Sequence, residues 1–206
     1  MFSPRELNLE RGWPGRIDGD RVVQLAAQTL QSFLTGGGEA REHAEYALPD
    51  VVLRAPVLHP PSVRIFGAGD FAFANPAAIR GPEEPVLLPD GADEIVPVER
   101  QTAIIGANGA VGAYTVLVEW VAPALTGAKR TDFAISLGPV ALTPDELPGL
   151  RWQPLVELAG RNTRLLPGDL LAEPVGKELP PARAGDVVAA GIQPFGLLRI
   201  PVAARG

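Results

Sequence analysis

The sequence has 206 residues, a length that suits one large domain or one domain with a small appendage. Its 23 glycines and 22 prolines follow no period, which excludes a collagen-like chain and disfavours long helices. The net charge of −6 argues against nucleic-acid and anionic-membrane partners. The absence of cysteine excludes disulfides and thiolate chemistry. With only two histidines, any metal site must use oxygen ligands, which favours Mg²⁺, Ca²⁺ or Mn²⁺.

Targeting signals are not visible in the sequence. The first ten residues contain no apolar stretch typical of a signal peptide. No run of about 18 apolar residues occurs anywhere in the chain. We therefore expect a soluble, cytoplasmic protein without a membrane partner.

A small module is predicted at the N-terminus, over residues 1–50. Asp18-Gly19 lies between two short β-prone runs and predicts a hairpin within residues 13–23. Apolar residues at helical spacing then predict a helix over residues 24–34, and the glycines at 36–38 end it.

Short apolar runs separated by turn residues begin at Val51 and define a second region, residues 51–206. A capping box with a proline at its second position predicts one helical turn over residues 143–146. The remaining runs recur about every ten residues, which predicts a β-sandwich, roll or barrel-like sheet in a mainly β (α+β) chain. The expected strands cover residues 51–54, 63–66, 85–88, 94–98, 102–106, 113–119, 133–137, 154–158, 169–172, 186–190 and 196–202.

Seven segments, taken in order, resemble the fumarylacetoacetate hydrolase (FAH) family. Residues 96–106, Val-Pro-Val-Glu-Arg-Gln-Thr-Ala-Ile-Ile-Gly, resemble the strand that carries Glu-x-Glu in that family. Residues 129–133, Lys-Arg-Thr-Asp-Phe, resemble its lysine segment and are followed by a Gly-Pro turn at 138–139. The other matching segments are residues 15–25, 53–65, 75–82, 166–171 and 184–188. The chain resembles a shortened and catalytically divergent member of the family.

This resemblance implies an FAH-like mixed β-sandwich or roll, commonly a homodimer, that holds a divalent ion and binds a small-molecule substrate. The ion chelates a 1,3-dicarbonyl or 2-oxo acid and stabilises its enolate. The family's metal ligands map to Glu99, Gln101 and Glu119. Its substrate-contacting lysine maps to Lys129, with Asp132 as the usual neighbour.

The sequence departs from the family at the site itself. Gln101 is an amide where the family has a carboxylate, and Glu119 is one methylene longer than the usual Asp. The family's His/Glu lid is missing, because residues 62–69 lead almost at once to Asn75. Neither His43 nor His59 lies where the lid histidine belongs.

Each candidate residue has a structural alternative to its functional role. Glu99, Gln101 and Glu119 form either a weakened Mg²⁺ or Mn²⁺ site or a vestigial polar cluster, so the cofactor is none or a weakly held ion. Lys129 either polarises a carbonyl or lies on a solvated turn. Asp70, Phe71, Phe73, Tyr114 and Trp120 either line the substrate pocket, together with Gln101 and Asp132, or belong to a turn and to the core.

We expect an FAH-fold small-molecule enzyme repurposed as an isomerase, cyclase or lyase. Its substrate would be an enolisable dicarbonyl or polyketide-like compound, in secondary metabolism, and Lys129, Glu119 and Glu99 would be the catalytic groups. Ordinary hydrolysis is disfavoured, because activation of water needs a positioned base. The alternatives are a divalent-metal-dependent C–C hydrolase or 2-oxo-acid decarboxylase, and a non-catalytic binding protein on the same fold.

Overall fold

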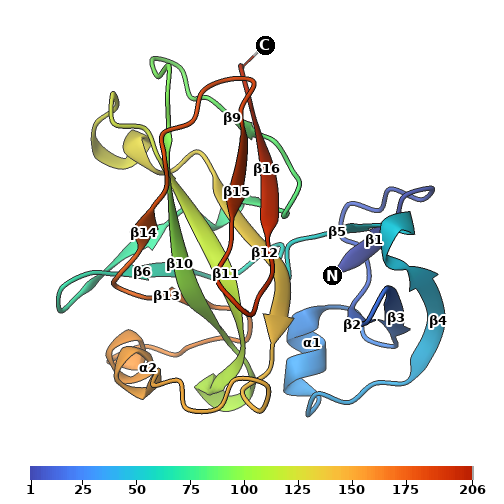
Figure 1. Cartoon of the computed structure of the whole chain (residues 1–206). Helices are drawn as coiled ribbons and strands as arrows, with labels where there is room; N and C mark the ends of the chain where they lie inside the picture. The colour runs from blue at the N-terminus through green and yellow to red at the C-terminus, as the bar shows by residue number, and fades with distance from the viewer. Residues whose placement is uncertain (206) are drawn as a thin grey trace.

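The computed structural model describes residues 1–205, and Figure 1 shows a small N-terminal module beside a larger β-roll. The module contains an antiparallel sheet of β2 (Gly15–Asp18), β3 (Arg21–Leu25) and β4 (Glu42–Ala47), and α1 (Leu30–Thr35) lies between β3 and β4. β1 (Phe2–Pro4) pairs with β5 (Val51–Leu53). The boundary expected after residue 50 therefore falls just before a strand that pairs back onto the module.

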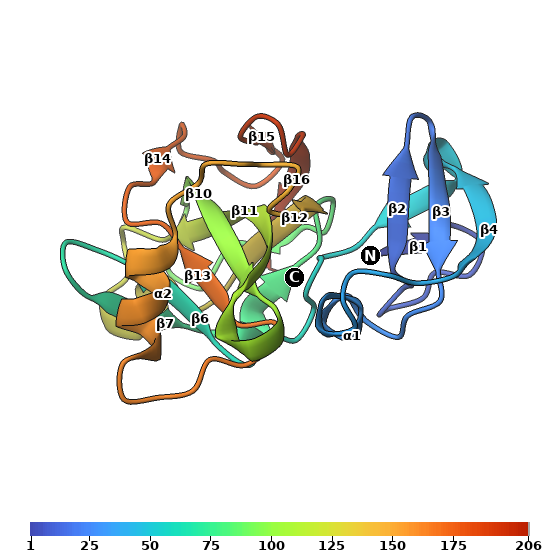
Figure 2. The same ribbon diagram turned by 90° about the horizontal axis from the view of Figure 1, so that it is seen from below.

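The module is held by its own small core. Phe2, Val22 and Val51 are buried, and Trp13 and Tyr46 pack on them through aromatic contacts with centroid distances of 5.4 to 6.3 Å. β5 leads from the module to the roll (Figure 1), and Figure 2, viewed from below, shows α1 between the module's strands and the roll.

The β-roll is built on one long, mixed sheet. Its order is β7-β6-β13-β10-β11-β12-β8, and β14 also pairs with β10. β6 runs parallel to β13 and β8 parallel to β12, while the other pairs are antiparallel. The strands are β6 (Val63–Phe66), β7 (Phe71–Ala74), β8 (Ile79–Arg80), β10 (Val96–Ile105), β11 (Val111–Val121), β12 (Ile135–Leu142), β13 (Leu170–Ala172) and β14 (Lys177–Glu178).

A second, three-stranded sheet packs on one face of the long sheet. It contains β9 (Val86–Leu87), β15 (Val187–Ala190) and β16 (Leu198–Ala203). Side chains from both sheets form the larger core, with Trp120, Phe195 and Ile200 almost fully buried. The opposite face of β10 and β11 contributes to a second core around Val63, Leu117 and Leu170.

The mainly β architecture predicted from the sequence is confirmed, with local differences. The expected strands 94–98 and 102–106 form the single strand β10, and β4, β7, β8 and β14 were not expected. Residues 154–158 belong to a helix, α2 (Gln153–Gly160), because Pro154 suits the first helical turn and the apolar residues follow a helical period. The N-terminal helix begins only at Leu30, where Thr29 caps it, while Gln24 and Leu25 belong to β3. Residues 143–146 form a turn in which Glu146 accepts from the Thr143 backbone, so the capping contact exists without a helix.

Candidate functional site

The register of β10 and β11 separates the three expected metal ligands. Val98 lies opposite Glu119, whereas Glu99 lies opposite Val118. Side chains of directly opposed residues point to the same face of a sheet, and neighbouring residues on a strand point to opposite faces. Glu119 therefore shares its face with Val98 and Arg100, and Glu99 and Gln101 lie on the other face. The structure therefore does not bring Glu99, Gln101 and Glu119 together on one face of the sheet.

Glu119 is instead paired with Arg100. Nε and Nη2 of Arg100 both lie 3.2 Å from Glu119 Oε2, and each side chain is 14% exposed. Nη1 of Arg100 donates to the backbone carbonyls of Glu173, at 3.1 Å, and Pro174, at 3.2 Å. The guanidinium is thus held by oxygens from β11 and from the segment between β13 and β14.

This ion pair lies at the wall of an open pocket of about 620 Å³. Such a volume suits a small organic ligand. β10 and β11 supply one wall, the segment after β11 supplies a second, and the segment around β14 supplies the third. The lining residues are Val96, Val98, Arg100, Glu119, Val121, Pro123, Arg130, Pro174, Val175, Gly176 and Glu178.

The segment just before β14 can approach β10 closely because residue 176 is a glycine. A Cβ at this position would lie 2.5 Å from Val98 Cγ1 and 3.0 Å from Arg100 Cζ. Only a residue without a side chain lets the backbone pass this near to the pair. Gly176 therefore sets the position of one pocket wall.

Glu99 occupies a separate site on the other face. It is 2% exposed, and its carboxylate accepts from Lys177 Nζ and from the Gly191 backbone N–H, each at 2.9 Å. Lys177 lies directly opposite Glu99 in the β10–β14 pair, so the contact is a cross-strand ion pair. A smaller recess of about 360 Å³ opens beside it. The backbone N–H of Gln101 donates to Glu173 Oε1 at 2.9 Å.

Lys129 does not line the pocket that contains Glu119. It belongs to the 3₁₀ turn η4 (Gly127–Arg130), its side chain is 80% exposed, and its Nζ lies 2.7 Å from Asp132 Oδ2. The next residue, Arg130, does line the pocket. The structure therefore places Arg130, rather than Lys129, at the pocket that contains Glu119.

The remaining predicted pocket residues are dispersed. Asp70 lies in the tight turn of the β6–β7 hairpin, where it accepts from the Phe71 backbone at 2.7 Å. Phe71 and Phe73 lie on β7 and pack edge to face, 5.5 Å apart. Tyr114 and Trp120 are in the larger core. The hairpin confirms that no lid separates β6 from Asn75.

A buried polar network joins this hairpin to β13 and was missed in the sequence. Arg64 is 5% exposed, and its guanidinium lies 5.6 and 5.2 Å from the rings of Phe71 and Phe73. Its Nη1 lies 3.4 Å from Asp169 Oδ2 and donates to Ser62 Oγ at 2.6 Å. These contacts fasten the hairpin and indicate a structural role.

Tyr114 and Trp120 make contacts typical of core residues. Trp120 Nε1 donates to Ser136 Oγ at 3.1 Å, and the Tyr114 ring lies 5.9 Å from that of Trp152 in a tilted arrangement. Burial raises the pKa of the Tyr114 hydroxyl above its ordinary value.

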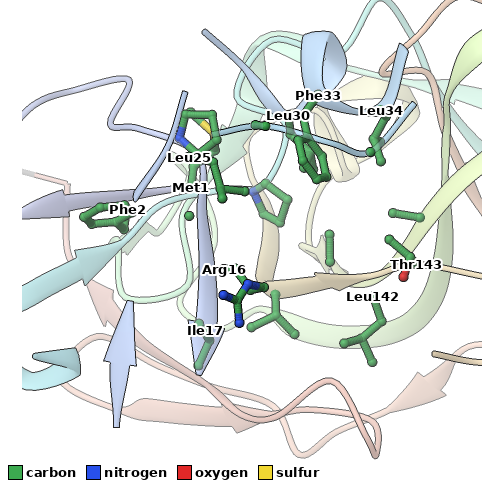
Figure 3. Close-up of a pocket in the computed structure, with 18 of the residues that line it drawn as sticks. Met1, Phe2, Arg16, Ile17, Leu25, Leu30, Phe33, Leu34, Leu142 and Thr143 are labelled. Carbon is green, nitrogen blue, oxygen red and sulfur yellow. The ribbon is translucent and has the colours of Figure 1, made fainter. Parts of the chain in front are cut away.

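A larger cavity, of about 900 Å³, lies between the N-terminal module and the end of β12. Figure 3 shows Leu30, Phe33 and Leu34 of α1 on one side of it and Leu142 and Thr143 on the other. Arg16, at its edge, is paired with Asp18 and Glu42 at 3.3 and 2.6 Å. The cavity contains apolar surface from both parts of the chain and none of the predicted catalytic residues.

A divalent ion does not fit the residues around Glu119. Within residues 1–205 no three Asp, Glu, His or Cys side chains are grouped so that they could hold a metal. Val98 has no donor atom, and the Glu119 carboxylate is already engaged by a cation. Mg²⁺ and Mn²⁺ are held by carboxylate, carbonyl and water oxygens, so an ion at this place would compete with Arg100 for the Glu119 carboxylate.

Comparison with solved structures identifies the fold. The structure matches maleylpyruvate hydrolase from Sphingobium sp. SYK-6 over 100% of both chains, with a TM-score of 0.79 and 20% identity. A manganese(II) and pyruvate complex of that hydrolase matches equally well, with a TM-score of 0.79 and 19% identity over 95% of this chain and 97% of that one.

Two further enzymes share the fold. 5-Carboxymethyl-2-hydroxymuconate delta-isomerase from Mycobacterium smegmatis matches at a TM-score of 0.73 and 22% identity over 94% of each chain. The apo form of 2-keto-3-deoxy-D-arabinonate dehydratase matches at a TM-score of 0.78 and 15% identity, over 100% of this chain and 98% of that one. No protein-family model and no curated protein sequence matches the chain. The chain has the fold of FAH-family enzymes, as the resemblance in its sequence predicted.

No helix within residues 1–205 is both long and apolar enough to cross a membrane.

Proposed function

We propose that the chain is a small-molecule enzyme whose active site is the pocket around Arg100 and Glu119. The observation that carries the proposal is the partly buried ion pair at the wall of a pocket large enough for a small acid. Valine and proline side chains form much of the remaining wall. Such walls lower the local dielectric and strengthen the interaction of a ligand with the charged groups.

The proposed substrate class is an enolisable oxo acid or dicarbonyl compound, including polyketide-like compounds. Arg130 adds a second guanidinium to the pocket lining, which favours an anionic ligand. The structural neighbours support this class, because they are named for maleylpyruvate, 5-carboxymethyl-2-hydroxymuconate and 2-keto-3-deoxy-D-arabinonate, and one of them was solved with pyruvate.

The proposed reaction is an isomerisation, cyclisation or decarboxylation that passes through an enolate. An Arg100 N–H would donate to the enolate oxygen. In an isomerisation, the Glu119 carboxylate would take a proton from one carbon and return it to another, so that no atom is gained or lost. These roles use the two side chains already in contact at 3.2 Å and do not require Lys129 or Glu99.

Hydrolysis is less well supported than these reactions. It requires a base placed to activate water, and the loop that carries such a base in the FAH family is replaced here by the short β6–β7 turn. Two further expectations stay predictions. A homodimer is expected from the resemblance and from the sheet that a missing lid leaves exposed, and a role in secondary metabolism from a retained fold with an altered pocket.

The proposal is tested by a substrate screen followed by proton NMR. Pyruvate, oxaloacetate, acylpyruvates and 1,3-dicarbonyl acids are incubated with the wild type, Glu119→Gln and Glu94→Gln. Glu94 is a matched control, since it is paired with an arginine at 3.0 Å but lies on the exposed surface. We expect at least one compound to be converted, with a loss of about 10²–10⁴ in rate for Glu119→Gln alone. Binding of a compound without conversion would favour the non-catalytic alternative, and equal rates in all three proteins would refute the site.

A further inference from the structure

The faces of β10 and β11 show which residues occupy the ligand positions of the metal site that the resemblance implies. Three ligands of one ion must point to the same face of the sheet. Glu119 occupies one of these positions, and the residues on β10 that share its face are Val98, directly opposite, and Arg100, two residues further. The Glu-x-Glu positions therefore coincide with Val98 and Arg100, one residue earlier than the sequence mapping to Glu99 and Gln101.

The guanidinium of Arg100 is surrounded by protein oxygens, as a bound metal ion would be. Oxygens of Glu119, Glu173 and Pro174 surround it at 3.1 to 3.2 Å. These contacts use Nε and Nη1, while Nη2 faces the same carboxylate oxygen and has two N–H groups. Arginine keeps its charge at every ordinary pH, so the position always holds a cation.

We propose that Arg100 permanently replaces the divalent ion of this fold, as a cation built into the chain. The charge that orients a ligand oxygen in the pocket then comes from the Nη2 group of Arg100. The ligand it suits is a carboxylate or enolate oxygen, because a guanidinium donates hydrogen bonds to such oxygens in a fixed geometry. This inference concerns the residues that form the site and holds whatever reaction the pocket performs.

The assignment predicts that metal binding can be restored. Val98→Glu together with Arg100→Glu would place three carboxylates on one face, with Glu119 as the third. We expect the wild type to show no Mn²⁺ binding that depends on Glu119, and the double variant to bind one Mn²⁺ per chain. Adding Glu119→Gln to the double variant should weaken that binding at least tenfold. Binding is measured by calorimetric titration with MnCl₂ and by the electron paramagnetic resonance signal of free Mn²⁺.

Arg199→Glu is the matched control for Arg100→Glu, since it makes the same charge change at an exposed position on β16 and should bind no Mn²⁺. Circular dichroism and thermal unfolding confirm that each variant is folded, and the single variant Arg100→Glu replaces the double variant if that one does not fold. Stoichiometric Mn²⁺ binding to the wild type that Glu119→Gln abolishes would overturn the proposal. A folded double variant that gains no Mn²⁺ binding would overturn the assignment of the ligand positions.

Discussion

Arg100 puts a permanent positive charge into a recess whose walls are largely valine and proline. Its partner Glu119 neutralises part of that charge, and two backbone carbonyls fix the guanidinium plane. At the scale of single residues, the candidate site is therefore an ordered ion pair that faces an open pocket. Gly176 determines how closely one pocket wall approaches this ion pair.

Gly176→Ala should destabilise the protein and disturb the pocket. The added Cβ would lie 2.5 Å from Val98 Cγ1, so either β14's leading segment or Arg100 must move. We expect a loss of about 1–3 kcal/mol in the free energy of unfolding, measured by urea denaturation. Gly67→Ala is the control, because its Cβ would meet only one atom, at 3.9 Å. An equal effect of the two substitutions would contradict the role given to Gly176.

Asp169→Ala should cost much more than the loss of an exposed ion-pair partner. It would leave the guanidinium of Arg64 buried without its carboxylate, at a cost of about 3–5 kcal/mol. Glu45→Ala breaks an exposed pair with Arg21 and should cost no more than about 1 kcal/mol. Chemical denaturation of both variants provides the comparison, and similar losses would show that the buried network is not structural.

At the scale of elements, the order and type of most strands could be predicted, whereas the face of each β10 side chain could not. Apolar runs and turn residues located the segments that became β6, β11, β13, β15 and β16. The side-chain direction, however, reverses with a shift of one residue, and only the pairing of β10 with β11 fixes it. The sequence alone therefore groups Glu99 with Glu119 and gives no sign that Arg100 shares the face of Glu119.

The same limit explains the misassigned residues 154–158. A short apolar run fits either a buried strand or one turn and a half of an amphipathic helix. Pro154 at the start of the run was the available signal for α2. Arg64 and Asp169 are 105 residues apart in the sequence, so only the parallel β6–β13 pair brings them together.

The burial of Tyr114, on β11, predicts that the stability of the folded protein depends on pH in the alkaline range. The pKa of Tyr114 is higher in the folded protein than its ordinary value of about 10, because burial disfavours the phenolate. The folded state therefore holds this proton more tightly than the unfolded chain, and stability falls as the pH rises above about 10. Tyr114→Phe should flatten this part of the profile of unfolding free energy against pH. Tyr46→Phe, at the other tyrosine, is the control, and an unchanged slope in Tyr114→Phe would be inconsistent with the burial argument.

At the scale of the whole molecule, the fold of FAH-family enzymes is kept while the parts that carry their chemistry differ. The long sheet and the second sheet enclose the core, and the N-terminal module lies beside them through the β1–β5 pair. The β6–β7 hairpin, built from two four-residue strands, contributes no residue to the lining of the Arg100 pocket. We infer that a pocket with a built-in cation retains the enolate chemistry and has lost the water activation.

The most direct test of this account is hydrogen–deuterium exchange at the α-carbon of an enolisable oxo acid, followed by proton NMR in the presence of EDTA. Exchange reports enolate formation without depending on the final product. The account predicts that the wild type accelerates exchange for at least one compound of the panel, that EDTA leaves the rate unchanged, and that Glu119→Gln abolishes it. Exchange that EDTA eliminates, or no acceleration for any compound, would contradict the account.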